Sequence, residues 1–190
     1  SVLLTSFAAG NAPDPFWIGS GGAQSYLERT VLYDITPLIE KDGMAAIGVF
    51  FSISDDDVMN VMRQPWIMMG SDGLPNYSAK KIHPRMTGTA PRILGHYVRE
   101  KGVITLEDAI RKMTSLPAQT FGFKGKGLLK PGFDADVTLF DPDTIIDKST
   151  YDSPFEPPAG IPYVIVNGKM AVRDGKVTGK ATGKVLRHNQ

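Results

Sequence analysis

Residues 66–73 read WIMMGSDG, an apolar run that passes directly into a polar turn. The run at 66–69 predicts a strand buried on both faces, and AAIGVFF at 45–51 predicts another. In parallel α/β architectures, functional side chains stand on loops at the carboxyl ends of strands. Asp72 occupies such a place, which makes it a candidate general base or metal ligand. The alternative is an Asp that only hydrogen-bonds its own turn, and the local pattern by itself favours that alternative.

Strands and helices alternate on both sides of this segment. Residues 2–4 predict a short strand and residues 26–41 a helix. Ser54 and Asp57 form a capping box, which predicts a helix that ends near Pro65. The first part of the chain is therefore expected to be an α/β structure.

Two further helices are expected downstream. Thr89 can cap a helix over residues 90–100, and Gly102 would stop it. Thr105 and Asp108 form a second capping box, followed by apolar residues at helical spacing over 106–113.

The hydrophobic period changes from helical to alternating after Gly122. Strands are expected at the four segments 135–140, 163–166, 170–173 and 176–177. Asn167-Gly168 and Asp174-Gly175 are strong signals for tight hairpin turns between them. The predicted fold class is α/β plus β, with an α/β part over 1–122 and an antiparallel part over 123–190.

Composition excludes several classes of function. The 190 residues contain 21 Lys+Arg and 20 Asp+Glu, a net charge of +1, so we expect no nucleic-acid or membrane partner. Cys is absent, and no apolar run approaches the roughly 20 residues that span a bilayer. A cytoplasmic location is expected, although the chain begins with Ser1, so a signal peptide is neither seen nor excluded.

Arg85, in the sequence His83-Pro84-Arg85, is a second candidate residue. We expect it in a loop, where its guanidinium could bind a substrate carboxylate through two parallel hydrogen bonds. A surface or interdomain salt bridge is the alternative, and spacing alone favours it. His96 is expected to pack or hydrogen-bond within its helix, and His188 lies near the end of the chain.

Together these motifs resemble the N-acyl-D-amino-acid deacylase (D-aminoacylase) family of the amidohydrolase superfamily. The motifs most specific to that family are GSDGLP at 70–75, HPR at 83–85 and GTAPRILG at 88–95. Further matches are KMTSLPA at 112–118, GLLKPG at 127–132, AD at 135–136, VNG at 166–168 and DG at 174–175. The resemblance extends from about residue 45 to the end of the chain.

The resemblance implies the C-terminal part of a (β/α)8 amidohydrolase barrel followed by strands of a small β-sandwich domain. Such a barrel alone needs about 250 residues, so the N-terminal part of the same enzyme is expected as a partner. The family's zinc ligands are a His-x-His on the first strand and residues on middle strands, which have no match here. Zinc would therefore be bound mainly outside this chain, with Asp72 as the single candidate ligand within it.

The resemblance also implies roles for four residues. Asp72 would be the acid/base that takes a proton from the metal-bound water and passes it to the leaving amine. Arg85 would bind the α-carboxylate of the N-acyl-D-amino acid, and Phe50 and Ile53 would line the side-chain pocket. Asn76 stands where family members often have His, so a different acyl or side-chain preference is expected.

Three functions remain open. The first is metal-dependent hydrolysis of the linear amide of N-acyl-D-amino acids. A cyclic-amide hydrolase of the dihydroorotase or hydantoinase kind is an alternative, which Arg85 disfavours because a linear substrate offers it a free carboxylate. The third is a non-catalytic fragment or assembly piece. In every case we expect the chain alone to be inactive, to bind zinc poorly and to fold poorly.

Overall fold

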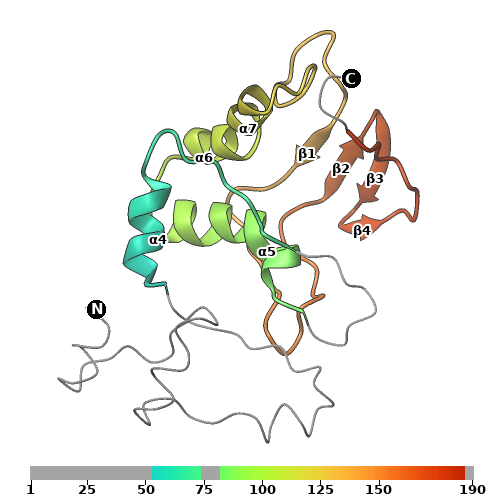
Figure 1. Ribbon diagram of the computed structural model, residues 1–190. Coiled ribbons are helices and arrows are strands. Elements are labelled where there is room, and N and C mark those ends of the chain that lie inside the picture. The colour runs from blue at the N-terminus through green and yellow to red at the C-terminus, as the bar shows by residue number, and fades with distance from the viewer. Residues whose placement is uncertain (1–52, 74–81, 187–190) are drawn as a thin grey trace, which may run out of the picture. The chain divides into compact units, whose positions relative to one another are not determined.

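The computed structural model describes residues 53–73 and 82–186. The strands expected at 2–4 and 45–51, the helix at 26–41, and Phe50 and Asn76 lie outside the described residues. The described elements are α4 (Asp55–Met62), α5 (Arg85–Arg92), the π-helix η1 (Ile93–Glu100), α6 (Leu106–Met113), α7 (Ser115–Thr120), β1 (Val137–Leu139), β2 (Tyr163–Val166), β3 (Lys169–Arg173) and β4 (Lys176–Val177) (Figure 1). The chain divides into two compact units, Ser1–Val58 and Met59–Gln190. The second contains every element after α4.

Both predicted capping boxes begin helices. The Ser54 hydroxyl accepts the backbone N–H of Asp57 at 3.1 Å and donates to its carboxylate at 2.8 Å. Thr105 accepts the backbone N–H of Asp108 at 3.2 Å at the start of α6. Each cap satisfies an amide that a helix otherwise leaves without a partner.

The helix that carries the GTAPRILG motif begins five residues earlier than expected. It starts at Arg85, directly after Pro84, so the predictions of a loop at Arg85 and of a cap at Thr89 are wrong. Pro84 has φ −55, already close to the helical value, and Thr89 lies inside the helix with its hydroxyl donating to the Arg85 carbonyl at 2.7 Å.

Pro91 lies inside this helix and cannot donate to the ladder. The helix continues beyond it as η1, in which the amide of Lys101 bonds the carbonyl of His96 at 2.9 Å, five residues back. The helix then ends at Gly102, which has φ +60 and confirms the predicted stop.

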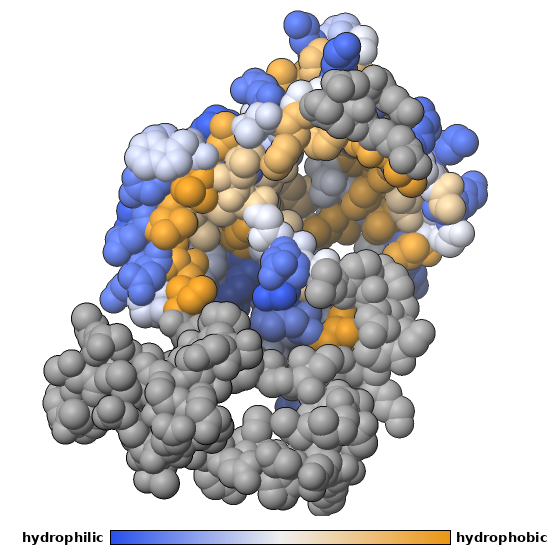
Figure 2. Space-filling view, viewed as in Figure 1, coloured by the Kyte–Doolittle hydropathy of each residue, from blue (hydrophilic) through white to orange (hydrophobic). Residues whose placement is uncertain are grey.

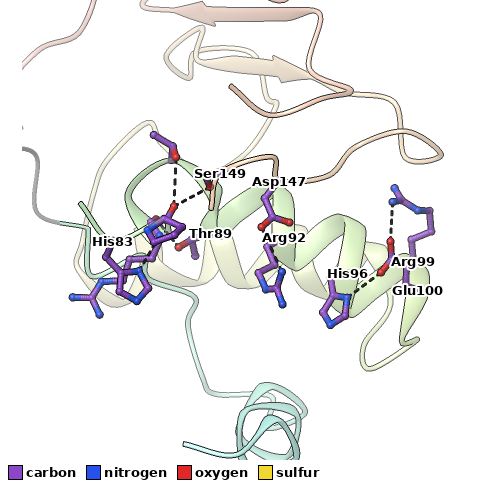
Figure 3. Close-up of polar contacts among 11 residues, drawn as sticks. His83, Thr89, Arg92, His96, Arg99, Glu100, Asp147 and Ser149 are labelled. Carbon is purple, nitrogen blue, oxygen red and sulfur yellow. Dashed lines mark hydrogen bonds and ion pairs between the residues drawn. The ribbon is translucent and has the colours of Figure 1, made fainter. Parts of the chain in front are cut away.

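Two glycines of this helix allow another segment to cross it closely. Gly88 and Gly95 are two turns apart and so share a face. A Cβ at Gly88 would lie 2.5 Å from the Ser149 hydroxyl oxygen, and one at Gly95 would collide with the Ile145 carbonyl. Arg99 then donates to that same carbonyl at 2.6 Å. In Figure 3, Asp147 and Ser149 lie on the segment that crosses this helix.

The four strands form one antiparallel sheet in the order β1-β2-β3-β4 (Figure 1). Both predicted hairpins are confirmed, with Val166 paired to Lys169 and Arg173 paired to Lys176. Asn167 and Gly168 have φ values of +52 and +72, and Asp174 and Gly175 have +50 and +73. Two positive φ values are what a type I′ turn requires, and that turn matches the twist of the strands it joins.

The strand predicted at 66–69 is wrong for the described part of the chain. No described strand pairs with these residues, and the Trp66 side chain is exposed. The segment is attached through its end, where the Met69 amide donates to the Lys112 carbonyl at 3.1 Å. An apolar run becomes a strand only when a neighbouring backbone pairs with it along its length, and the single bond from Met69 to Lys112 is not such a ladder.

The described residues bury few large apolar side chains. The buried hydrophobic residues are Met62, Ile93, Leu94, Val103, Ala109, Ala118 and Ile145. Much apolar surface is exposed, including Trp66, Leu129, Val177 and Val185, and orange apolar residues occupy much of the coloured surface in Figure 2. Within the described ranges, no helix has both the length and the apolar character needed to cross a membrane.

Candidate functional site

Asp72 and Arg85 form an ion pair, although thirteen positions separate them in the sequence. Arg85 Nη2 lies 2.8 Å from Asp72 Oδ2. The Asp72 side chain is 81% exposed and that of Arg85 40% exposed. The structure therefore brings together two residues that the sequence singled out separately, and it leaves the carboxylate open to solvent.

The described hydrogen bond within the turn at Asp72 is made by its neighbour Ser71. Ser71 accepts the Gly73 amide at 3.1 Å, so the neighbouring hydroxyl satisfies the turn. Asp72 has φ +47, a left-handed conformation that Asp tolerates better than most residues. This geometry turns the carboxylate toward Arg85.

Arg85 is held by its position at the start of α5. Its backbone amide donates to His83 Nδ1 at 3.1 Å. Its Nε is buried and has no hydrogen-bond partner in the described part of the chain. A guanidinium carries five N–H donors, so pairing with Asp72 leaves donors for a second anionic group.

His83 connects Arg85 to a distant segment. Its Nε2 lies 3.2 Å from the Tyr151 hydroxyl oxygen, and the two rings meet edge to face with centroids 5.3 Å apart. Burial, followed by the charge of Arg85, lowers the pKa of His83 below its usual value, although Asp72 opposes this change. Because Nδ1 accepts the Arg85 amide, the tautomer that fits both contacts carries its proton on Nε2, which then donates to the Tyr151 hydroxyl.

Sequence reasoning missed these contacts of His83 and Tyr151. His83 lies in the HPR motif, and Tyr151 lies 68 positions further along the chain. No local pattern signals a contact at such separation. His96, in contrast, pairs with Glu100 at 2.9 Å within its own helix, as expected (Figure 3).

The structure does not test the two proposed pocket residues. Ile53 belongs to the first compact unit, and its side chain is 72% exposed. Phe50 lies outside the described residues. Their roles remain predictions from the resemblance.

The described residues do not make a zinc site by themselves. Among them, no group of three or more His, Cys, Asp or Glu side chains gathers closely enough to hold a metal ion. Asp72, the single candidate ligand, is paired instead with the cation of Arg85. A zinc site requires three or four converging ligands, which this part of the chain does not provide.

Lys112, from the KMTSLPA motif, has a structural role. Its side chain is fully buried, and Nζ donates to the carbonyls of Met62, at 2.8 Å, and of Gln64. These carbonyls lie where α4 ends, so the ammonium satisfies acceptors that a helix terminus leaves open. Asp108 Oδ2, one turn earlier in α6, lies 3.7 Å from the ammonium.

A second cluster joins the AD and VNG motifs. Lys126 pairs with Asp134 at 2.9 Å and with Asp136, while Asp136 also accepts the Asn167 amide at 2.7 Å. The hydrogen bond from Lys126, and then that from the Asn167 amide, lower the pKa of Asp136. These residues fasten the turn between β2 and β3 to the segment before β1.

Comparison with known proteins connects this geometry to a family. Residues 24–172 match the model of the Amidohydrolase family. A D-aminoacylase of Alcaligenes xylosoxydans xylosoxydans is 41% identical over 81% of this chain and 31% of its own length. An N-acyl-D-glutamate deacylase of the same organism is 42% identical over 88% of this chain and 34% of its own length. The chain thus spans about a third of the length of these curated relatives.

Solved structures give the same result. A D-aminoacylase structure is 43% identical, has a TM-score of 0.68, and is matched over 72% of this chain and 28% of that one. The N-acyl-D-glutamate deacylase of Bordetella bronchiseptica, solved with zinc and a phosphonate mimic of the tetrahedral intermediate, is 44% identical with a TM-score of 0.61. It is matched over 67% of this chain and 27% of that one. A dihydroorotase of Lactobacillus johnsonii matches less, at 34% identity over 39% of this chain and 20% of its own length.

Proposed function

Because this chain belongs to the amidohydrolase family, we propose that it contributes Asp72 and Arg85 to an enzyme that hydrolyses the linear amide of N-acyl-D-amino acids. The ion pair at 2.8 Å is the observation that carries this proposal, since it places a carboxylate and a guanidinium in one site. Relatives that act on N-acyl-D-amino acids support the substrate class, at 41% and 42% identity over most of this chain.

Asp72 would act as the general base and then the general acid. Its carboxylate accepts a proton from the attacking water as the oxygen bonds to the amide carbon. It then delivers that proton to the nitrogen as the carbon–nitrogen bond breaks, which releases a carboxylate and a D-amino acid. The high exposure of this side chain leaves it accessible to substrate and water.

Arg85 would bind the α-carboxylate of the substrate. The guanidinium is anchored at the first residue of α5, and its Nε has no partner among the described residues. A second carboxylate beside the pair would use donors that Asp72 does not occupy. Ile53 and Phe50 would line the pocket for the amino-acid side chain, as the resemblance implies.

The remaining parts of the active site would come from an upstream part of the same enzyme. The described residues do not form a metal site, so zinc would be bound by that part. Residues 1–122 would then be the end of a barrel, and 123–190 a portion of a β-sandwich in a cytoplasmic enzyme. The exposed Trp66 supports this proposal, because an upstream part of the enzyme would cover it.

A panel of substrates tests the proposed activity. The full-length enzyme is expected to hydrolyse N-acetyl-D-amino acids and to leave their L-isomers and a 5-substituted hydantoin almost untouched. Preferential opening of the hydantoin ring would establish the cyclic-amide alternative. The intact mass of the protein, compared with the 20.6 kDa of this chain, tests whether it exists as a separate fragment.

A further inference from the structure

We infer that His83 and Tyr151 are positioning residues for Arg85, and that they hold its guanidinium where the substrate carboxylate binds. The inference rests on the proposed function, because it concerns how the carboxylate-binding residue is placed. The contact carrying it is the imidazole that bridges the Arg85 backbone and the Tyr151 hydroxyl.

The imidazole acts on Arg85 through its main chain. Its Nδ1 accepts the Arg85 amide at 3.1 Å, so it serves as a side-chain cap for the first residue of α5. Pro84 lies between His83 and Arg85, has no backbone N–H to donate and makes no side-chain cap hydrogen bond. Losing this acceptor leaves the first amide of the helix without its described partner and loosens the turn from which Arg85 projects.

Tyr151 fixes the other side of the imidazole. The segment that carries it is attached to the start of α5 at two points: Ser149 donates to the Pro84 carbonyl at 3.2 Å, and Thr87 donates to the Pro154 carbonyl at 2.9 Å. The segment that carries Tyr151 is therefore already hydrogen-bonded to the start of α5 where the Tyr151 hydroxyl contacts His83. The edge-to-face contact of the two rings adds a second restraint on the imidazole.

Steady-state kinetics of the full-length enzyme on an N-acetyl-D-amino acid tests the inference. His83→Ala is expected to raise KM about three- to ten-fold, because the lost cap loosens the turn that carries Arg85, while kcat stays within about two-fold. Tyr151→Phe should raise KM by about two- to three-fold, because it removes one neutral hydrogen bond. His83→Asn should restore most of the affinity, since an Asn carboxamide can also accept the amide two residues on.

A double variant separates positioning from general damage. In Arg85→Lys, the added change His83→Ala should raise KM by less than two-fold, because both changes weaken one contact. His96→Ala is the matched control: this residue follows Arg85 along the same continuous helix, and its described ion pair is with Glu100. It should leave KM unchanged, and thermal melting should show that each variant is folded.

The two possible failures give different results. If Arg85→Lys raises KM while His83→Ala and Tyr151→Phe do not, the positioning role is wrong and the proposed function stands. If Arg85→Lys itself leaves KM unchanged, the proposed role of Arg85 is wrong, and the inference is overturned with it. A KM rise for His83→Ala that is not reduced by His83→Asn also overturns the inference, because the Nδ1 acceptor would then not matter.

Discussion

At the scale of single residues, the turn around Asp72 divides its tasks between neighbours. Ser71 satisfies the Gly73 amide, and Asp72 adopts φ +47 with its carboxylate directed at Arg85. The Asp72 side chain is thus largely exposed to solvent, while the Ser71 hydroxyl accepts an amide of the turn. Because Ser71 makes this hydrogen bond, replacing Asp72 by Asn should preserve the fold.

Asp72→Asn should abolish turnover by about 10²- to 10⁴-fold while substrate binding and folding stay nearly intact. The amide keeps the size of the carboxylate and tolerates the left-handed conformation, but it cannot take the proton from water. The measurements are kcat, KM and thermal melting. Asp174→Asn is the control, because Asp174 also has a positive φ, of +50, in the turn before β4. A near-normal kcat for Asp72→Asn would show that this residue only shapes its turn.

Arg85→Lys should raise KM about ten-fold or more and change kcat less. An ammonium cannot reproduce the two parallel hydrogen bonds that a guanidinium makes to a carboxylate. The comparison is between an N-acetyl-D-amino acid and its carboxamide, which has no negative charge to bind. The variant should lose its affinity for the acid alone; equal losses on both substrates would contradict a role in binding the carboxylate.

At the scale of elements, the helix formed by α5 and η1 is shaped by the segment that crosses it. Gly88 and Gly95 give that segment room, and Arg99 bonds the carbonyl of the fully buried Ile145. The GTAPRILG motif therefore has a packing explanation that is independent of the reaction. Such a close crossing also brings Ser149 and Tyr151 to the start of the helix.

Gly95→Ala should destabilise the protein by about 1–3 kcal/mol, because an added Cβ would collide with the Ile145 carbonyl and approach the Ile146 main chain. Helix propensity predicts the opposite sign, since Ala is favoured over Gly by about 1 kcal/mol in an open helix. Denaturant unfolding of the two proteins decides between these outcomes. A stabilised variant would mean that the crossing segment does not pack as described.

The Lys126–Asp136 pair should make stability depend on pH under acid conditions. Folding lowers the pKa of Asp136 below its ordinary value of 3.8. At pH values between the lowered pKa and 3.8, the unfolded chain therefore binds more protons than the folded chain. Stability therefore rises with pH through this window and is lost as pH falls through it. Asp136→Asn keeps an acceptor for the Asn167 amide but loses the charge pair. The difference in unfolding free energy from wild type should shrink below about pH 3.5; a constant difference would contradict the linkage.

At the scale of the whole molecule, the described residues expose much apolar surface. Trp66 is 68% exposed, Leu129 81% and Val185 82%, whereas the buried apolar residues described are few and mostly of moderate size. Exposed apolar area of this kind commonly marks an interface. We therefore expect the upstream part of the enzyme to cover it.

The isolated 190-residue chain should neither retain stoichiometric zinc nor unfold cooperatively. Its described residues contain no cluster of three metal-ligating side chains, and they expose large hydrophobic side chains such as Trp66. Metal analysis after dialysis and differential scanning calorimetry are the measurements. Tightly bound zinc in a monodisperse, cooperatively melting monomer would refute this expectation. The full-length enzyme serves as the comparison and should show both properties.

Local signals were sufficient for the two capping boxes and the hairpins, but not for the cap expected at Thr89. Ser54, Thr105 and the Asn-Gly turn each act within three or four residues, and the structure confirms all of them. The signal failed where another part of the chain decides the result. Residues 66–69 have the apolar run of a strand, yet the structure forms no strand there. The start of α5 was also predicted wrongly: the helix begins at Arg85, directly after Pro84, and not at Ala90.

The sequence by itself determined the starts of α4 and α6, the type I′ turns, the family and the two residues of interest, because each depends on neighbouring side chains or on a motif. Only the tertiary structure decided that Arg85 lies against Asp72, that Tyr151 contacts His83, and that Lys112 is fully buried. These contacts join residues 13 to 68 positions apart or bury a charge whose acceptors lie about 50 residues earlier. Chain folding brings such groups together through packing and hydrogen bonds that no local spacing encodes.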